Sequence, residues 1–311
     1  MPSEMTANTP ALPPTGTLEA LAGASDETGF SHRRAARRRP RGPAALLTSG
    51  MLWLYAAVAV MPLLTMVLNS FRTNNELATD PLGLPADPSL AAYQEAWIEA
   101  SFSTYFVNSI VVTVASVLLS TVVSLLAAYA LARSRSRLLA VVEQVFISGL
   151  MMPVFLMIVP IFYLMDSLSL VSTRTGLILV YAAVSIPFSV FVLTTFFRQL
   201  PAELEEAACI DGAGPLRLFW SVMLPLVRPA VATVIVFRFV PIWNDFFYPL
   251  ILIRDRTKYT LPVGLTTFFG EYQTSWATLF AGLVIATVPL VVLFLAATRQ
   301  IITGLTAGMG K

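Results

Sequence analysis

Apolar residues divide the chain into long hydrophobic stretches separated by short polar segments. The stretches lie at about 46–70, 105–131, 141–165, 176–197, 230–253 and 277–298. Each has about the 20 residues that an α-helix needs to cross a bilayer. Backbone groups inside a bilayer must hydrogen-bond within their own segment, and the alternation typical of barrel strands is absent. The pattern therefore predicts an all-α integral membrane protein, a bundle of six transmembrane helices.

The composition agrees with a membrane environment and excludes most catalytic chemistry. Of 311 residues, 56% are hydrophobic and 12% are charged, against roughly 25% charged in a soluble domain. Cys209 and His32 are the single cysteine and the single histidine. A disulfide framework, a cysteine–histidine zinc site and a Ser-His or Cys-His catalytic pair are therefore excluded. No catalytic residue and no metal site is predicted.

The N-terminal residues differ from the rest of the chain. Residues 1–43 are predicted to be a disordered basic cytoplasmic tail, and residues 44–311 the membrane domain. Six arginines lie just before the first apolar stretch. Such a cluster can serve as a nucleic-acid arm, but beside a hydrophobic span its usual meaning is topological, and no nucleic-acid partner is predicted. A cleaved signal peptide is disfavoured because the apolar run is long and far from the start.

The positive charges predict the orientation in the membrane. Segments on the same side as the N-terminus hold fourteen Lys and Arg residues, and segments on the other side hold five. Cytoplasmic loops carry the excess of positive charge, so both termini are predicted to be cytoplasmic. The segment 71–104 is then external and is expected to contain a short helix at about 93–100.

The cytoplasmic segment 201–229 is predicted to form two short helices with a sharp break. Glu203 and its acidic neighbours suit a helix N-terminus. Gly212 and Gly214 can take the positive φ that ends a helix, and Pro215 can begin the next one, which is expected to stop at Pro225. The second helix is expected to present one apolar stripe made of Leu216, Phe219, Trp220 and Met223.

The same segment carries a specific string of residues. The string reads Glu206-Ala207-Ala208, Asp211-Gly212-Ala213, Phe219, Leu224-Pro225-Leu226 and Pro229. It resembles the EAA loop of the permease subunits of binding-protein-dependent ABC importers, in which a coupling helix sits in a cleft of a cytoplasmic ATP-binding subunit. An ordinary amphipathic interfacial helix is the alternative, but it explains neither the glycines nor the whole string. The resemblance implies a docking set of Glu203, Glu206, Ala207, Ala208, Asp211, Gly212, Ala213, Phe219, Leu224 and Pro225.

Later motifs extend the resemblance to the carbohydrate-uptake branch, specifically its MalG-like members. These motifs are Trp243-Asn244-Asp245-Phe246, Thr260-Leu261-Pro262-Val263-Gly264-Leu265 and Gly304-Leu305-Thr306-Ala307-Gly308. The resemblance implies the type I importer permease fold, with a conventional core at about 102–300, in a bacterial inner membrane. It also implies as partners a second permease subunit, in a heterodimer, a cytoplasmic ABC ATPase dimer and an extracytoplasmic solute-binding protein. The cargo would be a sugar or oligosaccharide, and the sequence does not name it.

Two further expectations concern chemistry inside the membrane. The chain has no Walker A pattern, so it is not expected to be an enzyme or to hold a cofactor, and ATP and Mg would be bound by the partner ATPase. Arg238, Trp243, Asn244 and Asp245 are candidates for the translocation pathway. Alternatively, the two charges cap helices or pair with the second permease subunit, and Trp243 is an interface anchor. A permease for a different solute class is the first alternative function, and an ion-coupled secondary transporter and a membrane-embedded enzyme are the rivals of a different mechanism.

Overall fold

The computed structural model describes residues 43–99, 101–268 and 275–307, with side chains for 45–98, 101–268 and 275–297. The chain divides into two compact units, Met1–Val58 and Ala59–Lys311, and the boundary falls within helix α2. Every regular element in the described residues is a helix. Most of the predicted N-terminal tail lies outside the described residues.

Long helices account for most of the described residues. They are α2 (Pro43–Asn69), α5 (Phe102–Arg133), α8 (Arg174–Gln199), α11 (Leu224–Asn244) and α14 (Trp276–Ala307). Five helical segments of the described residues are long and apolar enough to cross a membrane, and α6 (Arg137–Leu150) with the segment Val154–Ser167 adds a sixth if the bent pair is one span. The prediction of a six-span helical bundle is confirmed in this form.

The third predicted span, 141–165, is not one straight helix. Its two halves, α6 and the segment formed by a 3-10 turn (Val154–Met157) and α7 (Ile158–Ser167), are bent by 100°. Pro153 directly precedes the second half. Proline has no backbone N–H to donate and disfavours helical geometry in the residue before it, so the helix ends here.

The fifth predicted span, 230–253, has the wrong boundaries. The membrane-length helix runs from Pro215 to Asn244, and Pro225, the expected stop, lies inside it. A π-helical turn at Phe219–Met223 ends two residues before Pro225. A π turn shifts the hydrogen-bond register, which gives a residue without an N–H a place within a continuous helix. The predicted end of the span is instead a separate short helix, α12 (Phe247–Leu252).

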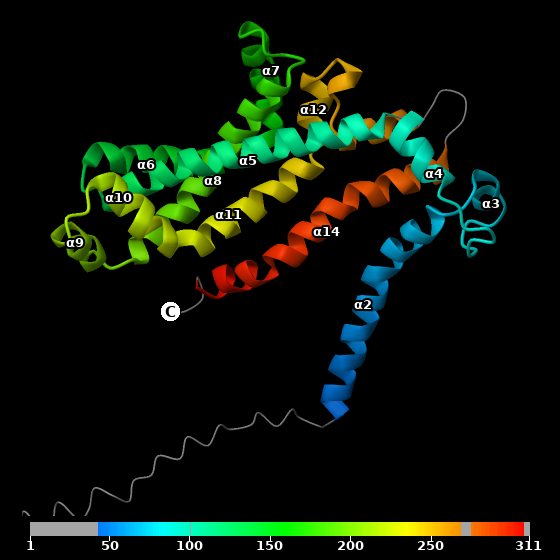
Figure 1. Ribbon diagram of the computed structural model, residues 1–311, viewed down its shortest axis with the longest axis horizontal. Coiled ribbons are helices and arrows are strands. Elements are labelled where there is room, and N and C mark those ends of the chain that lie inside the picture. Colours follow the sequence, from blue (N-terminus) through cyan, green and yellow to red (C-terminus); the bar gives the residue numbers. More distant parts are fainter. Residues whose placement is uncertain (1–42, 100, 269–274, 308–311) are drawn as a thin grey trace, which may run out of the picture. The chain divides into compact units, whose positions relative to one another are not determined.

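Helices α5, α8, α11 and α14 pack along one another, as Figure 1 shows. The contact between α5 and α8 is made with small hydroxyl residues, which let two backbones approach closely in a membrane. Buried serines lie on both helices, Ser116, Ser120 and Ser124 on α5 and Ser185 and Ser189 on α8, and Ser116 donates to the carbonyl oxygen of Ile178 on α8 at 3.4 Å.

Short helices lie at the two ends of this bundle. Helices α9 (Glu203–Ile210) and α10 (Pro215–Leu218) are at one end (Figure 1). The other end carries α3 (Asn74–Thr79), α4 (Ala91–Gln94) with a π turn (Glu95–Glu99), 3-10 turns at Arg256–Lys258 and Leu265–Phe268, and α13 (Leu261–Gly264). The helix expected at about 93–100 agrees with α4 and its π turn.

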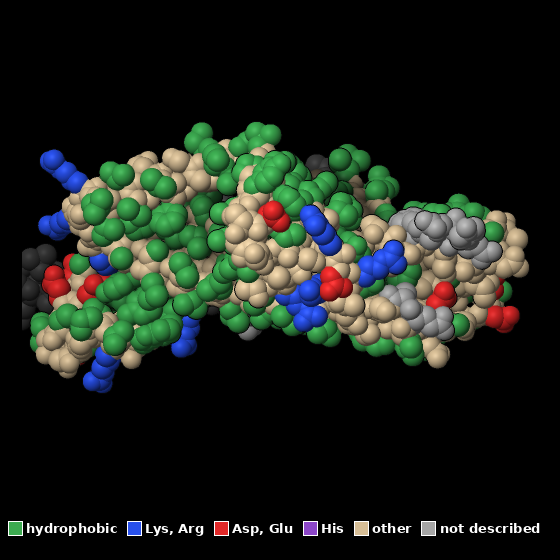
Figure 2. Space-filling view, turned by 90° about the horizontal axis from the view of Figure 1, so that it is seen from above, with side chains coloured by type: hydrophobic (Ala, Val, Ile, Leu, Met, Phe, Trp, Pro, Cys, Tyr) green, Lys and Arg blue, Asp and Glu red, His purple; other side chains and the backbone are tan. Residues whose placement is uncertain are grey.

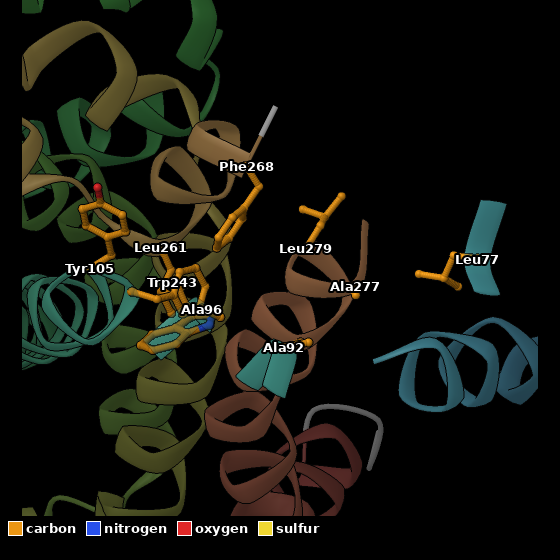
Figure 3. Close-up of a cluster of buried hydrophobic side chains, with 11 residues drawn as sticks. Leu77, Ala92, Ala96, Tyr105, Trp243, Leu261, Phe268, Ala277 and Leu279 are labelled. Carbon is orange, nitrogen blue, oxygen red and sulfur yellow. The ribbon is translucent and has the colours of Figure 1, made fainter. Parts of the chain in front are cut away.

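A buried apolar cluster consolidates the end opposite α9, and Figure 3 shows it. The indole of Trp243 is stacked on Phe239, and its Nε1 donates to the carbonyl oxygen of Ala286 at 3.0 Å, which links α11 to α14. Asn108 of α5 donates to the carbonyl oxygens of Thr257 and Tyr259, both at 2.9 Å. The loop that contains Thr257 and Tyr259 is therefore tied to α5 by hydrogen bonds from one buried amide.

Candidate functional site

The segment 201–229 forms a helix–turn–helix, which we call the elbow. Its turn ends α9 with a pair of hydrogen bonds: Gly212 N donates to Cys209 O at 3.0 Å, and Ala213 N donates to Ala208 O at 2.9 Å. These are the two bonds of a Schellman motif. Gly212 has φ +79, a left-handed conformation that costs glycine little. The prediction for Gly212 is therefore confirmed.

The second glycine does not take the predicted conformation. Gly214 has φ −72 and ψ 166, which is extended backbone, and it is the N-cap of α10. Pro215 follows in the first turn of that helix, as expected, since its fixed φ suits this position. One left-handed residue is thus enough to reverse the chain, and the residue before a proline is held in an extended form.

An ion pair fastens the elbow to α5. Arg133, the last residue of α5, donates from Nε to Glu205 Oε1 at 2.5 Å and from a second nitrogen to the carbonyl oxygen of Leu200 at 3.2 Å. Tyr129 donates its hydroxyl to the other oxygen of Glu205 at 3.3 Å. The side chains of Arg133 and Glu205 are 22% and 19% exposed, so the pair is largely shielded from solvent. It connects α9 directly to a helix of the bundle.

The expected apolar stripe of the second helix is split between two faces. Phe219 and Met223 are buried in a cluster with Phe197 of α8, while Leu216 and Trp220 are exposed. The π turn at Phe219–Met223 changes the residue spacing from that of a regular helix, so the predicted three-four pattern does not describe one surface. Phe219 therefore holds the elbow to the bundle through packing.

The predicted fifth span placed Arg238 and Asp245 in one helix, and the structure separates them. The helix stops at Asn244, and Asp245 is its extended C-cap, so Arg238 and Asp245 do not share one helix. An oxygen of Asp245 accepts from the hydroxyl of Tyr181 at 2.7 Å and from the backbone N–H of Tyr248 at 3.2 Å. Its carboxylate thus caps α12 and joins it to α8.

Comparison with known proteins assigns the chain to a family. Residues 120–305 match the model of the family described as binding-protein-dependent transport system inner membrane component. The chain belongs to this family of permeases. Over 85% of its length the permease is 36% identical to the diacetylchitobiose uptake system permease protein NgcG of Streptomyces coelicolor, of which the match covers 88%.

Other relatives and a solved structure agree. The permease is 36% identical to the arabinooligosaccharides transport system permease protein AraQ of Halalkalibacterium halodurans, covering 85% of this chain and 95% of the relative. A crystal structure of a bacterial ABC transporter involved in the import of the acidic polysaccharide alginate matches with a TM-score of 0.74 and 23% identity, covering 82% of this chain and 95% of that one. At that identity the likeness shows the fold.

The elbow of the permease exposes an apolar face beside carboxylates. Ile210, Leu216 and Trp220 are 86%, 77% and 56% exposed. In Figure 2 the elbow lies at the left end, where acidic and hydrophobic side chains are neighbours. Most of the docking set expected from the resemblance lies at this surface. Glu203, Glu206, Ala207, Asp211 and Gly212 are exposed, Ala208, Ala213, Leu224 and Pro225 are half-buried, and Phe219 is buried.

Candidate pathway residues are in three different surroundings. Trp243 is 3% exposed and packs between α11 and α14, so it is a core residue of this chain. Asn244 is exposed and donates to the carbonyl oxygen of Val240. The guanidinium carbon of Arg238 lies 4.1 Å from the ring centroid of Phe188, and Arg238 lines a cavity of about 630 Å³.

Sequence reasoning missed the residues that hold the elbow in place. Arg133 entered the prediction only as a positive charge that fixes topology, and Tyr129 not at all. Both residues lie at the end of α5, and Glu205 follows Arg133 by 72 residues, so no local signal in the sequence pairs them with the acidic loop. In the part of the chain that the structure describes, no group of three His, Cys, Asp or Glu side chains could hold a metal ion.

Proposed function

We propose that this permease is one transmembrane subunit of an ATP-driven importer of a bacterial inner membrane. Its elbow would dock in the cytoplasm on a separate ATP-binding subunit that holds ATP and Mg. Both termini of the chain would be cytoplasmic, in line with the excess of Lys and Arg on that side. The other half of the translocation pathway would come from a second permease subunit, and solute would be delivered by a binding protein on the opposite side.

The observation that carries the proposal is the exposed elbow, fastened to the bundle at two places. An apolar face containing Ile210 and Trp220, next to exposed carboxylates, is typical of a protein contact surface. Behind this face, Glu205 is ion-paired with Arg133 and Phe219 is buried. A push on the exposed side is therefore passed to α5 and α8 rather than absorbed by a loose loop.

This geometry supports coupling by alternating access. When two ATP-binding subunits close on nucleotide, they would draw the elbow with them, and the elbow would carry α5 and α11 because it is joined to both. The loop that contains Thr257 and Tyr259, which is tied to α5 through Asn108 and would be external, would respond at the far end. Binding energy at one site would thus bias the equilibrium between inward-open and outward-open bundles.

The proposed cargo is a sugar or an oligosaccharide. This rests on relatives whose names include diacetylchitobiose uptake and arabinooligosaccharides transport, at identities of 36% over 85% of this chain. The fold shared with an alginate importer is consistent with the same class. Uptake of a radiolabelled sugar panel by cells with and without the gene tests the substrate class.

Docking is tested by comparing the two glycines of the elbow. A side chain at either position would meet no atom within 4 Å in this chain, but only Gly212 has positive φ. A residue with a Cβ in the left-handed region costs about 1–2 kcal/mol. Gly212→Val should therefore distort the turn, reduce the ATP-binding subunit that co-purifies and abolish solute-stimulated hydrolysis, whereas Gly214→Val, the matched control, should keep substantially more of both.

Two results would contradict the proposal, and each contradicts a different part of it. Normal coupling in Gly212→Val would refute docking through the elbow. Uptake that persists without any ATP-binding subunit and follows an ion gradient would refute the importer as a whole and favour a secondary transporter.

A further inference from the structure

Two helix breaks of the permease lie side by side. The first separates α6 from α7 at Pro153, and the second separates α11 from α12 at Asp245. Phe155 follows the first break and Phe247 follows the second, and their rings meet edge to face with centroids 5.3 Å apart. Figure 1 shows α7 and α12 next to each other. One aromatic pair therefore joins the two breaks.

Contacts with α8 fix the depth of both breaks. A Cβ at Gly149, in the last turn of α6, would lie 3.2 Å from Cγ of Pro187, which is near the middle of α8. Asp245 accepts from the hydroxyl of Tyr181, about 10 Å along α8 from its first residue at a rise of about 1.5 Å per residue. Helix α8 is a candidate membrane span, and its ends extend only about 5 Å beyond a hydrocarbon core about 30 Å thick. Both breaks therefore lie inside the hydrophobic core of the membrane.

Helix ends at this depth cannot face lipid. The last turn of a helix leaves carbonyl groups without partners in the helix, and irregular backbone is tolerated in a membrane only where protein or a water-filled cavity satisfies it. This chain does not cover the breaks: Phe155 and Phe247 are 67% and 46% exposed, and Asn244, the last residue of α11, is also exposed. The surface made by Phe155, Asn244 and Phe247, which we call the break surface, therefore faces a water-filled pathway or another protein chain.

The composition of the break surface favours a pathway. Asn244 donates from Nδ2 to the carbonyl oxygen of Val240 at 3.0 Å, and no hydrogen bond from the described residues reaches its Oδ1. An apolar contact with another chain would leave this oxygen unpaired, at a cost in free energy. Water and the hydroxyl groups of a saccharide can donate to it, while the C–H face of a sugar ring can pack on a flat aromatic ring. Two aromatic rings beside one free acceptor are typical of a small-molecule site.

Asp245 holds the first turn of α12 in place. Its carboxylate accepts from the backbone N–H of Tyr248 at 3.2 Å and from the hydroxyl of Tyr181 at 2.7 Å. The rings of Tyr181 and Tyr248 also meet edge to face, with centroids 5.8 Å apart. Helix α12 is thus fixed to α8 at its start, so Phe247, its first residue, is presented in a defined position.

We propose that the break surface is a saccharide-stacking site in the translocation pathway. Phe155 and Phe247 pack against a sugar ring of the passing solute, and Asn244 accepts from one of its hydroxyl groups. Asp245 is a positioning residue that acts through Phe247. The inference rests on the proposed function, since it presumes an importer of sugars.

The test measures saccharide uptake by cells that express the whole transporter. The probe is the radiolabelled saccharide that wild-type cells import fastest from a panel containing diacetylchitobiose and arabinotriose. Phe155→Leu and Phe247→Leu keep an apolar side chain but remove the flat ring, so each should lower the maximal uptake rate about 2- to 10-fold. Phe155→Tyr and Phe247→Tyr keep the ring and should retain most of that rate. The apparent KM should stay the same, because the binding protein captures the solute first.

Matched controls come from the same two elements. Leu156→Ala in the 3-10 turn and Leu250→Ala in α12 shorten aliphatic side chains that are 75% and 47% exposed, and both should keep the wild-type uptake rate. Asp245→Asn weakens the hydrogen bonds that hold α12. Because Asp245 acts through Phe247, Asp245→Asn should lower the uptake rate in the wild-type background and have little further effect in Phe247→Leu.

A benzophenone amino acid in place of Phe155 gives a direct readout in the purified transporter. Illumination during ATP-driven turnover should attach the radiolabelled saccharide to this chain, and an excess of unlabelled saccharide should prevent the attachment. Capture of lipid or of another protein chain without saccharide would overturn the inference. So would wild-type uptake in both leucine variants, or equal losses in the leucine and tyrosine variants.

Failure of this inference is distinguishable from failure of the proposed function. If the leucine variants import saccharide with ATP at the wild-type rate, only the assignment of the break surface is wrong. If uptake by the wild-type protein needs no ATP-binding subunit, the importer itself is wrong.

Discussion

The ion pair between Arg133 and Glu205 is expected to carry force from the elbow to the bundle, so Glu205→Gln should weaken coupling without unfolding the permease. The amide keeps the shape of the side chain but removes the charge that faces Arg133 at 2.5 Å. The Arg133 side chain, 22% exposed, then keeps only neutral acceptors, the amide oxygen of the new glutamine and the carbonyl oxygen of Leu200, so it loses the charge-assisted part of the interaction.

The expected magnitude follows from the burial of the pair. Exposed ion pairs contribute about 0–1 kcal/mol, and hydrogen bonds to charged groups contribute about 1.5–3 kcal/mol. Side chains that are 22% and 19% exposed lie between these cases, so we expect about 1–2 kcal/mol. Since about 1.4 kcal/mol is a factor of ten, the balance between an attached and a detached elbow should shift about 5- to 30-fold.

The assay is ATP hydrolysis by the reconstituted transporter, with and without solute-loaded binding protein. Glu205→Gln should lower the stimulated rate of ATP hydrolysis and leave the basal rate unchanged. The ATP-binding subunits would still hydrolyse ATP, but fewer movements of the elbow would be transmitted to α5. Arg133→Met should have a similar effect, and the double variant should be no worse than either single one, as expected for two groups of one interaction.

Tyr129→Phe provides the graded control, because its hydroxyl donates to Glu205 at the longer distance of 3.3 Å. Its effect should be smaller than that of Glu205→Gln. Wild-type stimulation in Glu205→Gln, or strictly additive losses in the double variant, would refute the reasoning.

Two further predictions concern the end opposite the elbow. Asn108→Leu removes the donor to the carbonyl oxygens of Thr257 and Tyr259. It should lower the free energy of unfolding by about 1–3 kcal/mol, measured by denaturant titration of the purified permease, and make the loop more accessible to protease. An unchanged denaturation midpoint would show that water replaces the amide. Gly264→Ala would place a Cβ against the ring of Tyr105 and should destabilise the permease by about 1–3 kcal/mol through overpacking. The same titration should show this as a lower denaturation midpoint. The control Gly50→Ala, which has open space around it, should leave the midpoint unchanged.

Much of the fold follows from hydropathy, because membrane spans obey a simple length rule. The predicted helix boundaries were wrong where the backbone hydrogen-bond register decides whether a helix continues. Pro225 is a helix breaker by local propensity, yet a π turn before it keeps the helix continuous from Pro215 to Asn244. The break at Pro153 is visible as a proline, but its angle of 100° depends on packing that involves residues distant in sequence.

The candidate site divides in the same way. Gly212 could be predicted because few residues other than glycine adopt the left-handed conformation that ends a helix, and because its motif is local in sequence. The partners of Glu205 and Asp245 could not, since Arg133 and Tyr181 are separated from them by 72 and 64 residues. Nor could the separation of Trp220 from Phe219 be read from helical spacing, because the π turn changes it.

The central claim is that the elbow contacts an ATP-binding subunit, and the single native cysteine gives the most direct test. Cys209 is exposed on α9, so a thiol-reactive photo-cross-linker can be attached to it in the intact transporter, with Cys209→Ser as the blank. A second variant, Cys209→Ser with Asp255→Cys, moves the probe to the loop beside Thr257, at the end of the bundle opposite α9. The account predicts that the probe at Cys209 captures the ATP-binding subunit, with a yield that changes on adding ATP, and that the probe at residue 255 does not. Capture of that subunit from residue 255, or its absence at Cys209 in an actively transporting complex, would contradict the account.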